Sequence, residues 1–353
     1  MTGTPGPLGT GLRESPRPLT EAYDTAVFDL DGVVYIAGES VGDSPRHIAA
    51  ARATGMRVAY VTNNASRTPE EVAQRLRRIG VDCADGDVVT SAQAAARLVA
   101  RRVPAGSRVL VVGGGGLLAA LDEHGLVPVA RFDEGPAAVV QGFHPDVGWR
   151  LLAEGAAAVN AGLPWIASNT DLTVPTAYGR SPGNGTLVEV IARTTGASPE
   201  VAGKPQPPLF EETMLRVGGQ RPLVVGDRLD TDIEGAVRCG LDSLLVLTGV
   251  TDVATLATAA TGLRPSFVAA DLRGLFVPHA RPRVDAAQAT CGGWTARVES
   301  TGGDSHPALS GHGDPTDALR ALVSLCWARA DCDGAGWTAD VVDTAWQAAG
   351  LAL

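Results

Sequence analysis

Short apolar stretches alternate along most of the chain with segments of helical periodicity, and this alternation constrains the fold more than any other feature. Each of these apolar stretches is next to a segment of helical periodicity. They lie at 25–28, 57–61, 108–112, 137–141, 165–167, 223–225 and 243–247. Strands that alternate with amphipathic helices predict βαβ units and a mostly parallel sheet. There are too many such units for one ordinary sheet, so we expect two α/β sheets.

The two ends of the chain lack this alternation. Residues 1–20 are polar and rich in turn formers, which predicts a disordered tail. The prolines and scattered polar residues of 278–290 are typical of a linker. Four of the six tryptophans follow that linker, and they predict a small C-terminal module over 291–353 with a core of its own.

Composition excludes several classes of protein. No run approaches the roughly 18 consecutive apolar residues of a membrane span, and the first twenty residues lack the apolar segment of a secretory signal. The five cysteines show no regular spacing, which favours the reducing cytoplasm over a disulfide framework. With 29 basic and 39 acidic residues, the chain is not expected to bind nucleic acid or a membrane.

Polar side chains gather after four of the predicted strands, at the edge where open α/β sheets bind ligands. The four segments are Asp29-Leu30-Asp31-Gly32, Thr62-Asn63-Asn64, Gly203-Lys204-Pro205 and Gly226-Asp227-Arg228-Leu229-Asp230-Thr231-Asp232. Two carboxylates in the first segment leave a strand on the same side and would repel each other in a cleft without a cation. The second segment offers a hydroxyl, an amide and backbone N–H groups to an anion.

The other two segments add a cation and further carboxylates. Lys204 is the single lysine among 29 basic residues, and its compact ammonium is not equivalent to the planar fork of arginine. Asp227, Asp230 and Asp232 suit a hard cation such as Mg²⁺, although Asp230 could equally cap the following helix. A nucleophilic carboxylate, a second carboxylate, a phosphate cradle and a metal site together are what phosphoryl transfer requires.

These segments resemble those of the class IIA phosphatases of the haloacid dehalogenase superfamily. The similarity covers about residues 22–275 and extends through the first segment to Val33-Val34-Tyr35 and through the last to Ile233. Within the superfamily the chain is most similar to the actinobacterial glycerol 3-phosphate phosphatases, through residues 61–67, 89–93, 182–185 and 225–235. The resemblance implies a Rossmann-like parallel-sheet core over 21–98 and 199–277, an inserted α/β cap over 99–198, and a small C-terminal extension.

The resemblance also implies a role for each polar residue. Asp29 attacks phosphorus, and Asp31 protonates the leaving alcohol and then activates water. Mg²⁺ is bound by Asp29, by the backbone carbonyl of Asp31 and by Asp227, with Asp232 in support. Three further residues hold the phosphoryl oxygens: Thr62, Asn63 and Lys204. The implied activity is Mg²⁺-dependent hydrolysis of a phosphoric monoester through an aspartyl-phosphate intermediate.

The substrate is expected to be chosen by the cap loop 168–185. Four of its residues are predicted to face the leaving group: Asn169, Asp171, Tyr178 and Arg180. The loop has neutral hydrogen-bonding groups that suit a polyol, and Tyr178 is its only aromatic residue on which a base could stack. Glycerol 3-phosphate is therefore the best single prediction, with a sugar phosphate or a nucleotide as alternatives. A homodimer formed through the cap is a further expectation.

Other interpretations were weighed against this one. Gly113–Gly116 follows a strand, but Leu118 occupies the last glycine position of a dinucleotide-binding fingerprint, so a tight turn is favoured. The cysteines and histidines of the C-terminal part lack the close pairing of zinc ligands: Cys291, Cys326, Cys332, His306 and His312. A phosphotransferase or phosphomutase on the same fold stays open, as does a non-catalytic regulator, although the intact Asp29 and Asp31 count against the regulator.

Overall fold

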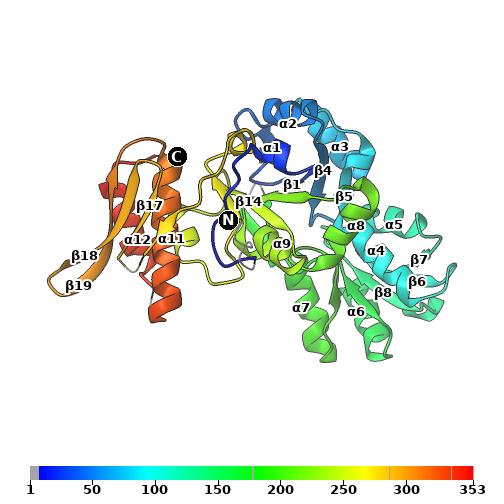
Figure 1. Cartoon of the computed structure of the whole chain (residues 1–353). Helices are drawn as coiled ribbons and strands as arrows, with labels where there is room; N and C mark the ends of the chain where they lie inside the picture. Colours follow the sequence, from blue (N-terminus) through cyan, green and yellow to red (C-terminus); the bar gives the residue numbers. More distant parts are fainter. Residues whose placement is uncertain (1–7, 177–178, 286, 335, 353) are drawn as a thin grey trace. The chain divides into compact units, whose positions relative to one another are not determined.

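All-parallel sheets dominate both parts of the chain, which confirms the predicted α/β fold. The structure, a computed structural model, describes residues 8–176, 179–285, 287–334 and 336–352. The chain divides into a first unit, residues 1–58 and 219–353, and a second unit, residues 59–218 (Figure 1). This division falls within strand β4 (Arg57–Thr62). It does not coincide with the predicted limits of core and cap, which therefore remain predictions.

The first unit contains four parallel strands in the order β15-β14-β13-β1. They are β1 (Thr25–Asp29), β13 (Pro222–Gly226), β14 (Asp242–Val246) and β15 (Phe267–Ala269). Strands β1 and β13 pair from Thr25↔Pro222 to Phe28↔Val225. This register places Asp29, at the end of β1, and Asp227, directly after β13, at the same edge of the sheet.

The second unit contains a five-stranded parallel sheet in the order β12-β9-β8-β6-β7. Its strands are β6 (Arg108–Val112), β7 (Val127–Val129), β8 (Ala138–Gln141), β9 (Trp165–Ala167) and β12 (Glu200–Val201). Helices α6 (Trp149–Asn160) and α7 (Asn184–Thr195) share a hydrophobic cluster with β6 and β8. Strands β6, β7, β8 and β9 lie in the stretch 99–198 in which the cap is predicted, and β12 directly follows that stretch.

The second unit also contains β5 (Val88–Thr90) and the helices α3 (Pro69–Arg78), α4 (Ser91–Arg102), α5 (Gly115–Asp122) and α8 (Pro207–Val217). Strand β5 pairs with β4 in parallel. Thr68 and Glu71 form a capping box before α3, and Thr90 and Gln93 form another before α4.

The glycine run Gly113–Gly116 forms the tight turn between β6 and α5 and the first residues of α5, as predicted. A Cβ atom on Gly116 would lie 2.4 Å from the carbonyl oxygen of Ala65, and one on Gly114 would lie 2.3 Å from the ring of His144. Close approach of neighbouring chain therefore accounts for these glycines. They need no dinucleotide to explain them.

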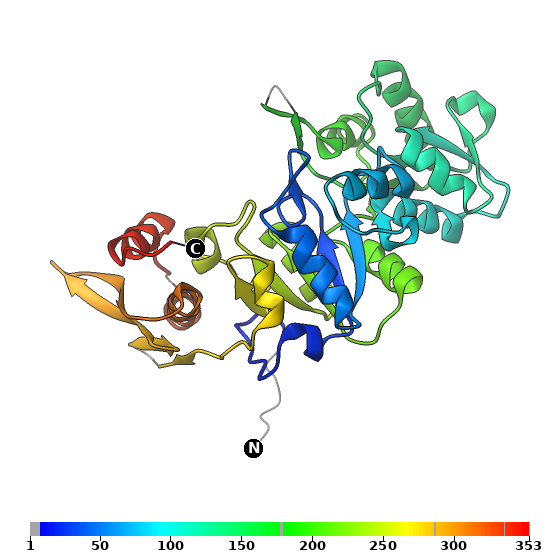
Figure 2. The ribbon, with the colours of Figure 1, turned by 90° about the horizontal axis from the view of Figure 1, so that it is seen from above.

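The C-terminal module is an antiparallel sheet, β16-β17-β18-β19, with two helices on one face (Figure 2). Its elements are β16 (Arg283–Val284), β17 (Gln288–Cys291), β18 (Trp294–Thr301), β19 (Asp304–Gly311), α11 (Pro315–Asp333) and α12 (Ala339–Ala348). Its four tryptophans are buried in one hydrophobic cluster with Ile233, Leu245 and Val268 of the first unit. The expected small core exists, but it is continuous with the core of the parallel sheet.

Residues 8–20, which the sequence assigns to a disordered tail, are placed by contacts within the first unit: Leu12 and Leu19 are buried, and Ser15 pairs with the backbone of His279. The short helix α1 (Leu19–Ala22) follows. The expected linker 278–290 contains β16 and a buried histidine. In both stretches a few buried side chains fix a chain that is otherwise polar. Among the described residues, no helix is both long and apolar enough to cross a membrane.

His279 connects the parallel sheet to the C-terminal module. Its side chain is 2% exposed. Its Nε2 lies 2.8 Å from the carbonyl oxygen of Gly274, and Arg320 Nη2 donates to its Nδ1 at 3.0 Å. Arg320 also pairs with Asp317 at 2.8 Å. Burial, with the neighbouring Arg320 guanidinium, lowers the pKa of His279 to about 4.

This pKa predicts acid sensitivity. An unfolded histidine binds a proton below about pH 6.5, whereas folded His279 does so only near pH 4. Its contribution to stability is therefore complete above pH 6.5 and is lost as the pH falls toward 4. Between pH 7 and pH 4, we expect the unfolding free energy of the wild type to fall by about 3 kcal/mol more than that of His279→Gln. Urea unfolding at each pH measures both, and equal pH slopes would contradict the assignment.

Candidate active site

Three carboxylates of the first unit come together at the carboxyl edge of its sheet. One oxygen from each of Asp29, Asp227 and Asp232 lies within 4.8 Å of the other two. Asp227 and Asp232 are buried, and Asp29 is partly exposed. Like charges at this spacing repel one another unless a cation balances them. An all-oxygen donor set of this kind fits Mg²⁺.

The backbone around Asp227 packs closely against the carboxylate of this residue. The backbone N–H of Val250 donates to Asp227 Oδ2 at 2.7 Å, and that of Thr251 donates to the Asp227 carbonyl at 3.2 Å. Cβ atoms on Gly32 and Gly249 would lie 2.4 and 2.0 Å from Asp227 Oδ2, so neither position has room for a side chain. The loop 248–251 was not predicted from the sequence. The Thr248-Gly249 pair after the apolar strand is the sequence signal that could have identified this loop.

A π-helical turn, η3 (Leu229–Ile233), separates the roles of the two aspartates that follow. Asp232 accepts a hydrogen bond from the backbone N–H of Arg228 at 3.2 Å and faces the cluster. Asp230 instead accepts from Arg228 Nε and Nη2 at 3.0 and 2.7 Å. This pairing with Arg228 lowers the pKa of Asp230. Asp230 is therefore neither a member of the cluster nor a helix cap.

Asp31 lies on the turn that follows β1. Its carboxylate is exposed and does not belong to the cluster. The turn is held by Gly32, whose N–H donates to the Tyr35 carbonyl at 2.9 Å and whose carbonyl accepts from Thr248 Oγ1 at 2.6 Å. The strands β2 (Tyr35–Ile36) and β3 (Glu39–Ser40) form a hairpin after it.

In the second unit, the structure brings together most of the residues predicted to hold phosphate and substrate. Thr62 is buried at the end of β4, and its Oγ1 accepts from the backbone N–H of Asn64 at 3.1 Å. Lys204 is also buried. The side chain of Asn63 hydrogen-bonds to the backbone of Lys204 and to the carboxylate of Asp171.

The residues predicted to face the leaving group have different surroundings. Asn169 is buried, and its amide donates to the carbonyl of Asn63 at 2.6 Å and accepts from the N–H of Asp171 at 3.1 Å. Its side chain is therefore hydrogen-bonded within the protein, and its contact with the leaving group stays a prediction. Arg180 is exposed on β11 (Gly179–Pro182), which pairs with β10 (Thr173–Thr176). Tyr178 lies outside the described residues.

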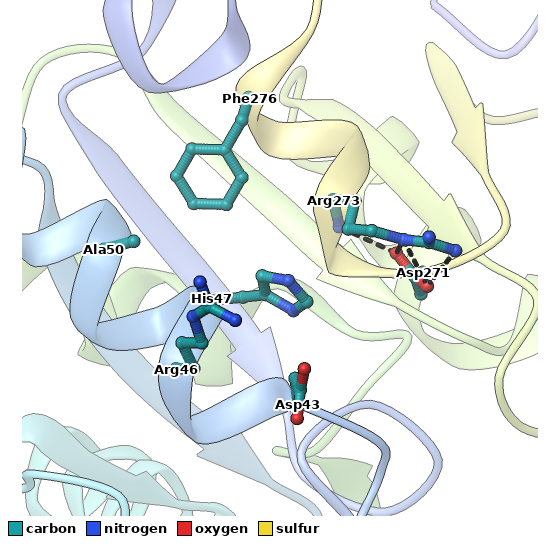
Figure 3. A pocket seen from close by; sticks show the side chains of 7 residues that line it. All are labelled: Asp43, Arg46, His47, Ala50, Asp271, Arg273 and Phe276. Carbon is teal, nitrogen blue, oxygen red and sulfur yellow. Dashed lines mark hydrogen bonds and ion pairs between the residues drawn. The ribbon is translucent and has the colours of Figure 1, made fainter.

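A polar hollow in the first unit lies apart from these residues. It has a volume of about 420 Å³ and lies between α2 (Ser44–Ala53) and the turn η4 (Leu272–Phe276) (Figure 3). His47 and Phe276 face each other across it with ring centroids 6.1 Å apart, and Arg273 is paired with Asp271. None of the described residues predicted for the site lines this hollow.

No zinc site forms in the part of the chain that the structure describes. There, Asp29, Asp227 and Asp232 are the one group of three or more side chains placed to hold a metal ion. Cys291 and Cys326 are buried separately from such a group. Burial raises the pKa of each of these two thiols to about 12, which leaves them protonated at neutral pH.

Comparison with known proteins agrees with this geometry. Residues 26–127 match the haloacid dehalogenase-like hydrolases, and residues 201–275 match the HAD-hydrolase-like family. D-glycerol 3-phosphate phosphatase of Mycobacterium tuberculosis is 44% identical over 259 residues, which are 73% of this chain and 72% of that protein. The chain belongs to the haloacid dehalogenase-like hydrolases.

Other members of this family are also similar. Acid sugar phosphatase of Staphylococcus aureus is 36% identical over 65% of this chain and 88% of its own length. Among solved structures, glycerol phosphate phosphatase from M. tuberculosis in complex with magnesium has 40% sequence identity and a TM-score of 0.80. The match covers 88% of this chain and 92% of the mycobacterial chain. The p-nitrophenyl phosphatase from Archaeoglobus fulgidus is 28% identical over 72% of this chain and 98% of its own, with a TM-score of 0.66.

These findings confirm the predicted family and its α/β fold. They also confirm that the chain is a phosphoric monoester hydrolase, and a non-catalytic regulator is not favoured. The predicted Mg²⁺ is supported by the oxygen-only cluster of this chain and by the magnesium in the mycobacterial structure.

The crowding around Asp227 gives a test of the metal site. We expect Gly249→Ala to raise the Mg²⁺ concentration for half-maximal activity by about tenfold or more, because the new Cβ displaces the Asp227 carboxylate. Gly11→Ala is the matched control, since Gly11 has open space around it. Mg²⁺ titrations of phosphate release and of binding by calorimetry measure the effect. An unchanged Mg²⁺ dependence would show that Asp227 does not hold the ion.

Proposed function

We propose that the protein hydrolyses glycerol 3-phosphate, or a phosphate ester of similar size, through a phosphorylated Asp29. The observation that carries this proposal is the oxygen-only cluster of Asp29, Asp227 and Asp232 at the carboxyl edge of the first sheet. In a haloacid dehalogenase-like hydrolase, this cluster pairs a partly exposed carboxylate, able to act as a nucleophile, with two buried ones.

In the first step, a carboxylate oxygen of Asp29 attacks phosphorus and the bond from phosphorus to the alcohol oxygen breaks. Asp31, as the carboxylic acid, gives its proton to that oxygen and the alcohol leaves. The exposed position of Asp31 beside the nucleophile on the same turn suits this role.

In the second step, Asp31, now a carboxylate, takes a proton from a water molecule, and the water oxygen attacks phosphorus. The bond from phosphorus to Asp29 breaks, so inorganic phosphate leaves and both aspartates return to their starting states. Because Asp31 acts as acid and then as base, one residue completes the proton balance of the cycle.

The ligands of Mg²⁺ in this proposal are Asp29, the backbone carbonyl of Asp31 and Asp227, with Asp232 behind them. When bound, Mg²⁺ offsets negative charge on the phosphoryl group and on the carboxylates. Thr62 and Lys204 are proposed to hold the phosphoryl oxygens through a hydroxyl and an ammonium.

Glycerol 3-phosphate is proposed as substrate because the mycobacterial relative that carries this name matches 73% of the chain. Among the described cap-loop residues, Asp171 and Arg180 remain candidates for contact with the leaving alcohol. A sugar phosphate is the second candidate, favoured by the similarity to acid sugar phosphatase. We also propose a cytoplasmic location, which the absence of disulfides among the five cysteines supports, and a homodimer formed through the cap.

Asp29→Asn tests the nucleophile. The amide has nearly the same shape but cannot attack phosphorus, so we expect kcat to fall by about 1000-fold or more while the fold is kept. Asp82→Asn, at an exposed position, is the matched control and should keep the wild-type rate. Phosphate release by both proteins measures the effect. A rate for Asp29→Asn within tenfold of the wild type would refute the role.

A comparison of kcat/KM values tests the substrate. We expect glycerol 3-phosphate to exceed a nucleoside monophosphate and a hexose phosphate by about tenfold or more, which is about 1.4 kcal/mol of transition-state binding. The reverse order for either competitor would overturn the substrate proposal and leave the phosphatase chemistry intact.

A further inference from the structure

The side chain of Asn63 makes three hydrogen bonds at a junction of the second unit. Its Oδ1 accepts from the backbone N–H of Lys204 at 2.8 Å. Its Nδ2 donates to the carbonyl oxygen of Lys204 at 3.1 Å and to Asp171 Oδ2 at 3.1 Å. Both hydrogens of the amide are therefore committed to the protein. None is left in this arrangement for a phosphoryl oxygen.

The two bonds to Lys204 act on the donor and the acceptor of one residue. They fix the orientation of its backbone as a neighbouring strand would. The amide of asparagine supplies both a donor and an acceptor at this reach, whereas a carboxylate cannot donate and glutamine is one methylene longer. The backbone held in this way carries the single lysine of the chain, which is 4% exposed.

Asn63 is itself held in place from the other side. Its carbonyl oxygen accepts from Ser91 Oγ and from Asn169 Nδ2, each at 2.6 Å. A Cβ atom on Gly203 would lie 2.5 Å from Asn63 Oδ1, so the residue before Lys204 leaves the space that the amide needs. The segments after β4, β9 and β12 and the start of α4 thus converge on this one side chain.

We propose that the Asn63 side chain is a positioning residue for Lys204 and not a phosphate ligand, and that Asp171 extends this hold to the cap loop. The inference deepens the proposed function, because it matters for turnover only if Lys204 holds the phosphoryl group. It replaces the role predicted for the Asn63 amide from the sequence. The buried Asn169, which the sequence placed at the leaving group, belongs to the same support.

The expected size of the effect follows from geometry. A shift of about 1 Å in a group that contacts the reacting phosphate costs on the order of 100-fold in rate. Removal of the amide frees the Lys204 backbone to shift, so Asn63→Ala should lower kcat by about 100-fold with a smaller change in KM.

A double-mutant cycle tests the proposal, with kcat and KM for glycerol 3-phosphate measured in Asn63→Ala, Lys204→Ala and the combined variant. If Asn63 acts through Lys204, its loss should cost about threefold or less once Lys204 is already alanine. Two losses that multiply would show that Asn63 contacts the phosphate independently. Asn160→Ala, at the exposed end of α6, is the matched control and should match the wild type.

A second cycle, with Asn63→Asp and Asp171→Ala, provides a measurement if Asn63→Ala folds poorly. Asn63→Asp brings a second carboxylate to the 3.1 Å contact with Asp171 and also loses the donor to the Lys204 carbonyl. Asp171→Ala should therefore lower kcat in the wild type, where it removes the acceptor of that contact, but should not lower it in Asn63→Asp, where it removes the repulsion. A loss of the same size in both backgrounds would overturn the link to Asp171.

The wild type separates this inference from the proposed function. If the wild type hydrolyses no phosphate ester, the proposed function and the inference fall together. If it is active on another ester, the cycle is measured with that ester. Multiplying losses would then overturn the role of Asn63 alone.

Discussion

Repulsion among the carboxylates of Asp29, Asp227 and Asp232 is the constraint on which the rest of the first unit depends. The parallel register of β1 and β13 brings two of them to one edge, and the turn η3 brings the third. Left alone, such a group would favour a looser arrangement. The buried strands behind it, two glycines without room for a side chain and a backbone N–H from Val250 hold the carboxylates in place. The fold thus prepares a cation site at a cost to its own stability.

The second unit organises its polar residues by a different principle. Its junction contains amides, hydroxyls and backbone groups that satisfy one another, with Lys204 as the buried cation. The side chains of Asn63 and Asn169 there have hydrogen-bond partners close by, which is how buried polar groups are tolerated away from water. The first unit thus brings carboxylate charges together, whereas the second unit holds its polar side chains in place by hydrogen bonds.

The sequence predicted what depends on local periodicity and on residue type at strand ends. The alternation of strands and helices, the capping box at Thr68 and the aspartates at the end of β1 and after β13 all belong to this class. It did not predict what depends on contacts between distant segments. Asp230 and Asp232 are two residues apart and equally acidic, yet only the π-helical turn decides that one pairs with Arg228 and the other joins the cluster. The burial of Asn169 and the fixed conformation of residues 8–20 also depend on such distant contacts. Asn169 contacts Asn63, and Ser15 contacts His279.

The continuity of the hydrophobic cluster beneath the C-terminal module has a consequence for how this chain can evolve. Trp327 and Trp346 share that cluster with Leu245 and Val268, which are strand residues of the catalytic sheet. A premature stop codon before α11 would leave those strands with an uncovered apolar surface. Truncation of the module would therefore act against the phosphatase through the stability of its sheet, independently of any activity in the module itself.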